Sequence, residues 1–126
     1  KPLSDDPAFA ARLARVEIDL ENMKTTNLRV IAAVAGGGVP GAESSMLKIR
    51  GTEIRQEISS LARRAMGVHG RPFIAEALKD GFTGETFGPA YASAAASRYF
   101  NNRKLSIFGG SNEIQKNIIS KMILGL

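Results

Sequence analysis

Apolar residues recur every three or four positions along the first third of the chain, which is the spacing of one face of an α-helix. The members of this series are Phe9, Leu13, Val16, Leu20, Met23, Val30 and Val34, with Asn27 in the same register. Asp5 or Asp6 can cap the start of the helix, and Pro7 suits its first turn because no hydrogen bond is lost there. Three glycines at residues 36–38 end the series, so we predict a helix over residues 7–35.

A second apolar series with helical spacing follows this glycine-rich turn. Its members are Leu47, Ile54, Ile58, Leu61 and Ala65. Gly51 falls in the same register, where the lack of a side chain allows a neighbouring helix to come close. Arg63 and Arg64 in the last turn complement the helix dipole, and Gly67 suits the C-terminal cap. We predict this helix over residues 42–66.

The rest of the chain has shorter patterns. Glycines and prolines interrupt the stretch after the second helix and leave room for a short helix near residues 74–79. Small residues favour a helix over residues 90–101, and a final apolar series predicts one over residues 111–124. Because no segment alternates as a strand does, we predict an all-α, up-down helical bundle. It forms one domain over residues 1–126, with residues 1–6 as a linker.

The composition is that of an ordinary globular domain, with 44% hydrophobic and 23% charged residues. No apolar run approaches the roughly 18 residues of a membrane span. The first residues lack the apolar core of a secretory signal, and we interpret them as an internal stretch of a longer protein. Cysteine is absent, which excludes disulfides and thiolate metal sites, and we expect a cytoplasmic protein. The net charge of +5 suits a polyanionic ligand such as a nucleotide cofactor or nucleic acid.

Three patterns have simpler interpretations than a functional site. The spacing of Gly36 and Gly41 is that of a phosphate loop, but the required lysine and hydroxyl residue do not follow. Glu17 and Glu21 lie one helical turn apart, but a di-metal bundle also needs a Glu-x-x-His pattern that is missing. The basic residues of the second helix are spread around it among acidic ones. We therefore predict neither a metal site nor a nucleic-acid site.

His69, the only histidine, lies in the loop after the second predicted helix, between Gly67 and Gly70. The simpler interpretation is a loop residue that makes a hydrogen bond to the backbone. A contact with a ligand is the alternative, because loops often carry function.

The stretch richest in candidate chemistry covers residues 107–115, with the sequence IFGGSNEIQ. Gly109 and Gly110 allow the backbone to approach a ligand closely, and the helix that follows presents free N–H groups and a positive dipole. A pyrophosphate, or a carbonyl oxygen that becomes enolate-like, suits such a site. An ordinary capped helix start is the alternative.

Residues 99–104 and 107–119, with the sequences YFNNRK and IFGGSNEIQKNII, closely resemble the C-terminal signature of acyl-CoA dehydrogenases. The loop over residues 67–70 and the order of the long helices are also similar to that family. The resemblance implies an FAD-dependent enzyme of fatty acid metabolism that oxidises an acyl-CoA and passes electrons to an acceptor. It also implies a homodimer or homotetramer, or a heteromer, whose subunits carry two further domains and the first helix of the bundle ahead of residue 1.

The resemblance assigns roles to two groups of residues. The N–H of Gly109 would polarise the thioester carbonyl, as an oxyanion donor does. The residues that would lie near the FAD are Gly110, Ser111 and Glu113, with Gln115 as a weaker candidate. The residues that would face the FAD pyrophosphate or adenosine of a neighbouring subunit are Arg64, Gly67, Val68, His69 and Gly70.

One position departs from the family pattern. Many members have the catalytic glutamate where this sequence has Gly109, and glycine cannot abstract a proton. Other members supply the base from an earlier helix, which would precede residue 1, and Glu113 lies a full turn from the position of Gly109. We therefore expect the isolated chain to be inactive. The alternatives are a non-catalytic subunit of a heteromeric flavoprotein and an unrelated helical interaction module.

Overall fold

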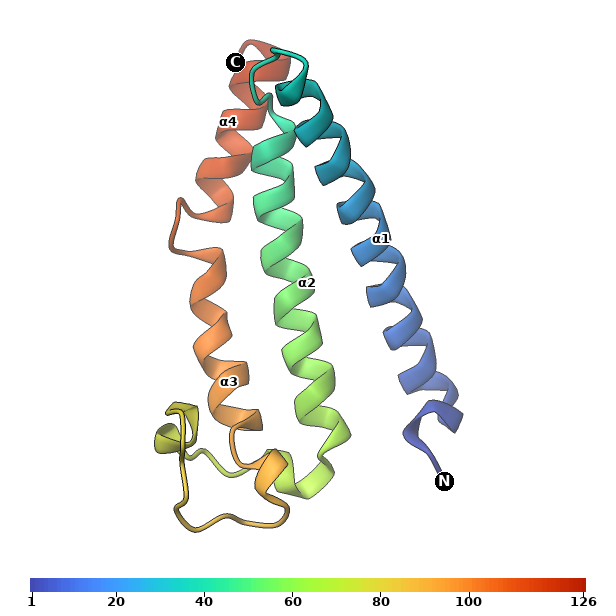
Figure 1. Cartoon of the computed structure of the whole chain (residues 1–126), viewed down its shortest axis with the longest axis vertical. Helices are drawn as coiled ribbons and strands as arrows, with labels where there is room; N and C mark the ends of the chain where they lie inside the picture. Colours follow the sequence, from blue (N-terminus) through green and yellow to red (C-terminus); the bar gives the residue numbers. More distant parts are fainter.

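The computed structural model describes residues 1–126, and every regular element in it is helical. Four α-helices follow one another along the chain: α1 (Pro7–Ala35), α2 (Glu43–Ala65), α3 (Ala95–Asn101) and α4 (Asn112–Leu124) (Figure 1). Short 3-10 turns lie at Leu3–Asp5, Gly67–Gly70, Ala75–Leu78, Ala90–Ala92 and Asn102–Ser106. The predicted all-α class is confirmed. None of the helices combines the length and the hydropathy that a membrane-spanning segment needs.

Local hydrogen bonds explain where α1 begins. Asp6 is its N-cap, because Oδ1 accepts hydrogen bonds from the N–H groups of Ala8 (2.8 Å) and Phe9 (3.1 Å). Pro7 occupies the first helical position, where a missing N–H costs nothing. The sequence offered Asp5 or Asp6 for this cap, and the structure selects the second.

Two details differ from the prediction. The C-cap of α2 is Met66, and Gly67 follows it in the left-handed conformation (φ +55°). Residues 90–101 do not form one helix, since a 3-10 turn and α3 divide this segment. The hydroxyl of Ser93 donates a hydrogen bond of 2.7 Å to the carbonyl of Ala90, which competes with the helical pattern and favours the tighter turn.

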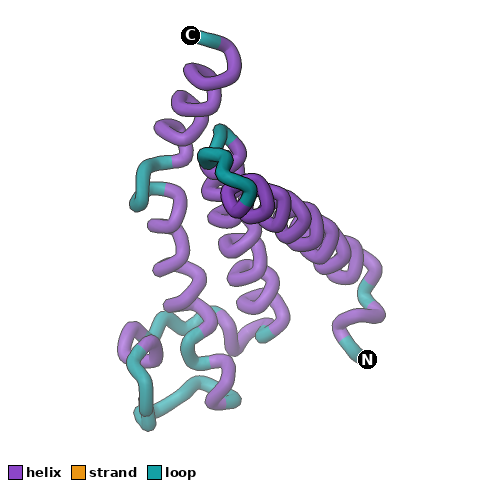
Figure 2. Tube along the Cα trace, turned by 45° about the horizontal axis from the view of Figure 1, so that its top comes forward, coloured by secondary structure: helices purple, strands orange, loops and turns teal.

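The helix α2 is central to the arrangement. α1 packs along one side of it, and α3, α4 and the turn between them pack along the other side (Figure 1). α1 and α2 lie side by side near the turn that joins them, and their other ends spread apart (Figure 2). The buried apolar cluster joins these two helices and consists of Val16, Ile54 and Leu61, with Phe9 and Met23 packed against it. Ion pairs of Arg12 with Glu57 and of Arg50 with Asp19 also connect them.

Much of the predicted apolar face is not covered within the chain. Val16 is the one fully buried member of the first series, while Leu13 remains 38% exposed and Val34 43% exposed. Ile58 of the second series is also 43% exposed. Periodicity shows which residues share a face, but α1 has one long helix as its principal neighbour, so that much of this face stays open.

Candidate functional site

The turn before α4 presents free backbone donors. Gly109 (φ +68°) and Gly110 (φ +80°) are consecutive residues in the left-handed conformation, which favours glycine. Their N–H groups find no acceptor within the chain, and both residues are exposed. α4 is 13 residues long and directs the positive end of its dipole toward them. This turn can therefore donate hydrogen bonds to a carbonyl oxygen or an anion.

Side chains at the start of α4 shape this turn. Ser111 is the N-cap, and its Oγ accepts a hydrogen bond of 3.3 Å from the N–H of Ile114. Gln115 lies beside Gly110, because a Cβ placed on that glycine would stand 2.6 Å from Gln115 Nε2. Gly109 has open space around the same position. Of the two glycines, Gly109 is thus the one that a ligand can approach freely.

The carboxylate of Glu113 is exposed in the first turn of α4. A hydrogen bond with its own backbone N–H lowers its pKa most, and the Ser111 hydroxyl and the charges of Lys116 and Lys48 lower it further. A lowered pKa makes the carboxylate a weaker proton acceptor, whereas a general base works best with a pKa near the working pH. Glu113 is thus poorly suited to act as a base.

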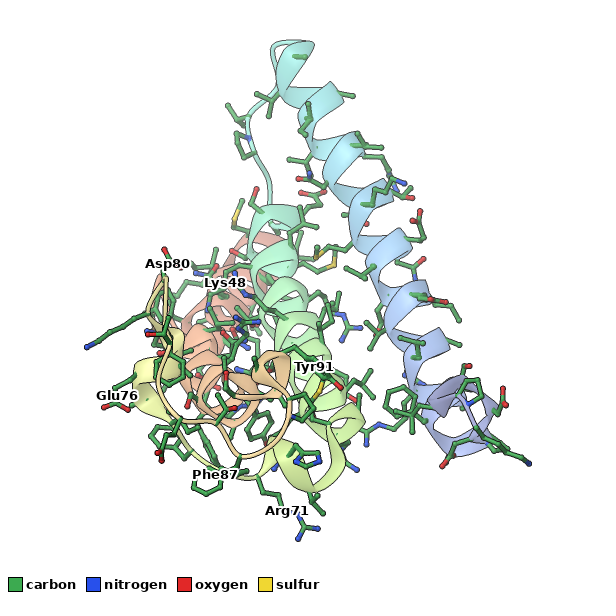
Figure 3. The ribbon with its side chains drawn as sticks, turned by 60° about the horizontal axis from the view of Figure 1, so that its bottom comes forward. Lys48, Arg71, Glu76, Asp80, Phe87 and Tyr91 are labelled. Carbon is green, nitrogen blue, oxygen red and sulfur yellow. The ribbon has the colours of Figure 1, made fainter.

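Asn112 is a central residue of this region whose role the sequence alone did not indicate. It is buried, its Oδ1 accepts a hydrogen bond from Nζ of Lys48 (2.9 Å), and its Nδ2 donates one to Oγ1 of Thr52 (3.2 Å). Figure 3 shows Lys48 projecting from α2 beside the ribbon of α4. An asparagine directly after a serine N-cap was the available signal, but its partners lie on a distant segment.

The second predicted group lies at the C-terminal end of α2. Gly67–Gly70 form a 3-10 turn in which Val68 is 64% exposed and Gly70 is buried against the carbonyl of Arg63. Nδ1 of His69 lies 3.2 Å from the carbonyl oxygen of Phe87, so the predicted hydrogen bond to the backbone is confirmed. It connects this turn to the loop that carries Phe87 (Figure 3). This bond leaves Nε2 of His69 free to contact a ligand.

The two predicted groups do not meet within one chain. The start of α4 contacts Thr52 of α2, and Arg64 comes twelve residues later on the same helix. At a rise of about 1.5 Å per residue the two places lie roughly 18 Å apart along α2. In Figure 1 the start of α4 lies beside α2 and away from the end of α2 that leads into the loop. One chain therefore offers two separate surfaces rather than a single pocket.

An aromatic cluster supports the segment between these surfaces. The guanidinium groups of Arg63 and Arg103 lie 4.6 and 4.8 Å from the ring centre of Tyr99. Phe100 makes edge contacts with Tyr99 (5.2 Å) and with Phe73 (5.9 Å) between ring centres. These contacts attach α3 and the loop before it to the end of α2.

A comparison with protein families identifies the chain. A sequence model of the family described as acyl-CoA dehydrogenase, C-terminal domain, matches residues 1–124. Searches among curated proteins and among solved structures found no match. The family match includes the turn at Gly109 and the loop at Gly67–Gly70, and the all-helical fold agrees with it. The chain therefore belongs to the acyl-CoA dehydrogenase family and represents its C-terminal domain.

Proposed function

We propose that this domain contributes the substrate carbonyl site and part of the flavin site of an FAD-dependent acyl-CoA dehydrogenase. The observation that carries the proposal is the exposed Gly109–Gly110 turn, with unpaired N–H groups at the positive end of α4, in a chain of this family.

The N–H of Gly109 would donate a hydrogen bond to the thioester carbonyl of an acyl-CoA. Negative charge grows on that oxygen as the α proton leaves, so a fixed donor stabilises the transition state more than the ground state. FAD, when bound, supplies the acceptor for the hydride that leaves the β carbon. Gly110, Ser111, Glu113 and Gln115 then form the adjoining surface toward the flavin.

The proton-abstracting base is proposed to lie outside residues 1–126. Gly109 stands where many family members have a glutamate, and Glu113 has a lowered pKa. The isolated chain is accordingly proposed to have no turnover. A non-catalytic subunit of a heteromeric flavoprotein is the second candidate, and Gly109 is the observation that favours it.

The loop that follows α2 is proposed to contact FAD held by a neighbouring subunit. Arg64 lies about 18 Å along α2 from Thr52, which contacts the start of α4, and this separation supports a role of the loop in the site of another subunit. The exposed basic side chain of Arg64 and the unpaired Nε2 of His69 suit a pyrophosphate or a ribose hydroxyl. The open apolar face of α1 supports assembly into a homodimer or homotetramer.

The deciding experiment uses the full-length subunit that carries this domain. Purification with bound FAD, followed by bleaching of the flavin absorbance by a panel of acyl-CoAs under anaerobic conditions, is the expected result. Bound flavin that no acyl-CoA bleaches would favour the non-catalytic subunit. A subunit without any affinity for FAD would contradict both candidates.

A further inference from the structure

We infer that Lys48, Thr52 and Gln56 are positioning residues that hold the Gly109–Gly110 turn in place from both of its ends. The three residues follow one another at intervals of four on α2 and therefore lie on one face of that helix. We call them the α2 polar row. All three side chains are half-buried between α2 and the segment that leads into α4.

Gln56 holds the chain ahead of the turn. Its Nε2 lies within donating distance of the carbonyl oxygens of Asn102 (3.2 Å) and Arg103 (3.4 Å), and of Oγ of Ser106 (3.3 Å). These acceptors belong to the 3-10 turn Asn102–Ser106, which ends just before the glycine turn. The Gln56 amide thus attaches the backbone of this 3-10 turn to α2.

Lys48 and Thr52 hold the chain after the turn. Lys48 donates a hydrogen bond of 2.9 Å to Oδ1 of Asn112, and Nδ2 of Asn112 donates one of 3.2 Å to Oγ1 of Thr52. Asn112 is the first residue of α4 and is buried, so these bonds set the position of the helix start. The Thr52 hydroxyl donates its one hydrogen to the carbonyl of Ile49 (2.7 Å), which leaves its oxygen to accept the bond from Asn112.

The turn itself has little other support. Ile107 and Phe108 are 70% and 53% exposed, so that they do not anchor it in an apolar core. Gly109 and Gly110 have no side chains and no hydrogen bonds from their N–H groups. The direction of these N–H groups therefore depends on the contacts at residues 102–106 and at Asn112, which the α2 polar row supplies.

The effect on catalysis rests on the proposed function, so the test has two separate readouts. The first is hydrogen–deuterium exchange of the full-length flavoprotein subunit, read over residues 107–116. Thr52→Val removes the hydroxyl and keeps the shape, and Thr52→Ser keeps the hydroxyl. In Thr52→Val we expect the protected amides of Ile114 and Gln115 to exchange about tenfold faster, the effect of one lost hydrogen bond. Thr52→Ser and peptides from α1 should exchange at the wild-type rate.

A second variant tests the other end of the row. Gln56→Met keeps the length of the side chain and removes the donor, and we expect faster exchange at the amides of Ile107 and Phe108. Wild-type exchange over residues 107–116 in both Thr52→Val and Gln56→Met would overturn the inference. If Thr52→Val does not fold, Gln56→Met alone decides, because it leaves Asn112 and its partners intact.

The second readout is flavin reduction by an acyl-CoA in a single turnover. We expect flavin reduction in Thr52→Val to be about tenfold slower than in the wild type, with a substrate affinity within about twofold of the wild-type value. A displaced N–H donor stabilises the transition state less but changes the binding of the substrate little. Thr52→Ser should restore the rate, which a merely destabilised domain would not require. Faster exchange together with an unchanged flavin rate would keep the positioning role and contradict the proposed oxyanion role of Gly109.

Discussion

Nζ of Lys48 lies 2.9 Å from Oδ1 of Asn112, a residue 64 positions later in the sequence. The contact joins the first half of α2 to the first residue of α4, and Thr52 contacts the same side chain. It places a lysine charge beside the helix start whose backbone donors are exposed at Gly109. The candidate site thus depends on α2 as much as on the glycine turn itself.

Replacing Asn112 with alanine should destabilise the domain. The change leaves the half-buried Lys48 ammonium group without its acceptor and the Thr52 hydroxyl without its donor, and we expect a loss of about 1–3 kcal/mol in the free energy of unfolding. Urea denaturation followed by circular dichroism measures it. The matched control is Asn117→Ala, an exposed asparagine on the same helix, which should change the free energy by less than about 0.5 kcal/mol. Equal effects of the two changes would contradict the role given to Asn112.

Replacing two glycines of the α2 region with alanine should change the stability of the domain in opposite directions. A Cβ on Gly51 would make an ordinary contact of 3.5 Å with Sδ of Met23, so Gly51→Ala should stabilise α2 by about 0.5–1 kcal/mol. A Cβ on Gly70 would collide with the carbonyl of Arg63, and Gly70→Ala should lower the melting temperature. Thermal unfolding of both variants checks the signs, and a destabilised Gly51→Ala would show that α1 lies too close to α2 for a contact of 3.5 Å with Met23.

Gly109 and Gly125 form a matched pair for testing the proposed oxyanion donor. Their φ values are +68° and +69°, and a Cβ would have open space at either residue. Alanine at either position should lower the free energy of unfolding by a similar amount, about 1–2 kcal/mol for a left-handed residue. Only Gly109→Ala should slow flavin reduction in the full-length subunit, by about tenfold or more, because it shifts the N–H donor. The same slowing in Gly125→Ala would point to a general loss of structure.

Glu113 should make the domain sensitive to acid. Its folded-state pKa lies below the ordinary value of 4.5, so its contribution to stability is present above that value and is lost as the pH falls through the folded-state pKa. Melting temperatures measured between about pH 3 and pH 7 should fall less steeply toward acid in Glu113→Gln than in the wild-type domain. Glu17→Gln, which removes an exposed carboxylate from α1, is the control and should follow the wild-type curve. If the melting temperatures of Glu113→Gln and the wild type fall in parallel as the pH is lowered, this carboxylate does not stabilise the domain.

The sequence by itself determined where helices begin and end when the caps of those helices are made by residues a few positions away. Asp6 caps α1 through N–H groups two and three residues away, and Ser111 caps α4 through Ile114, so short sequence windows contain both signals. Left-handed Gly125 ends α4 for the same local reason. The residues 107–115 were also visible as a candidate site, because two glycines followed by a capped helix start have a local chemical meaning.

Only the tertiary structure decided which distant residues support that site and how much of the apolar face is buried. In the sequence, the polar row of Lys48, Thr52 and Gln56 has the pattern of a solvated helix face. In the structure, α4 and the turn before it pack against this row. The same packing separates the Gly109 turn from the loop at Gly67–Gly70 and leaves Leu13 partly exposed on α1. These features depend on contacts between residues tens of positions apart, and helical periodicity describes one element at a time without specifying which neighbour covers each face.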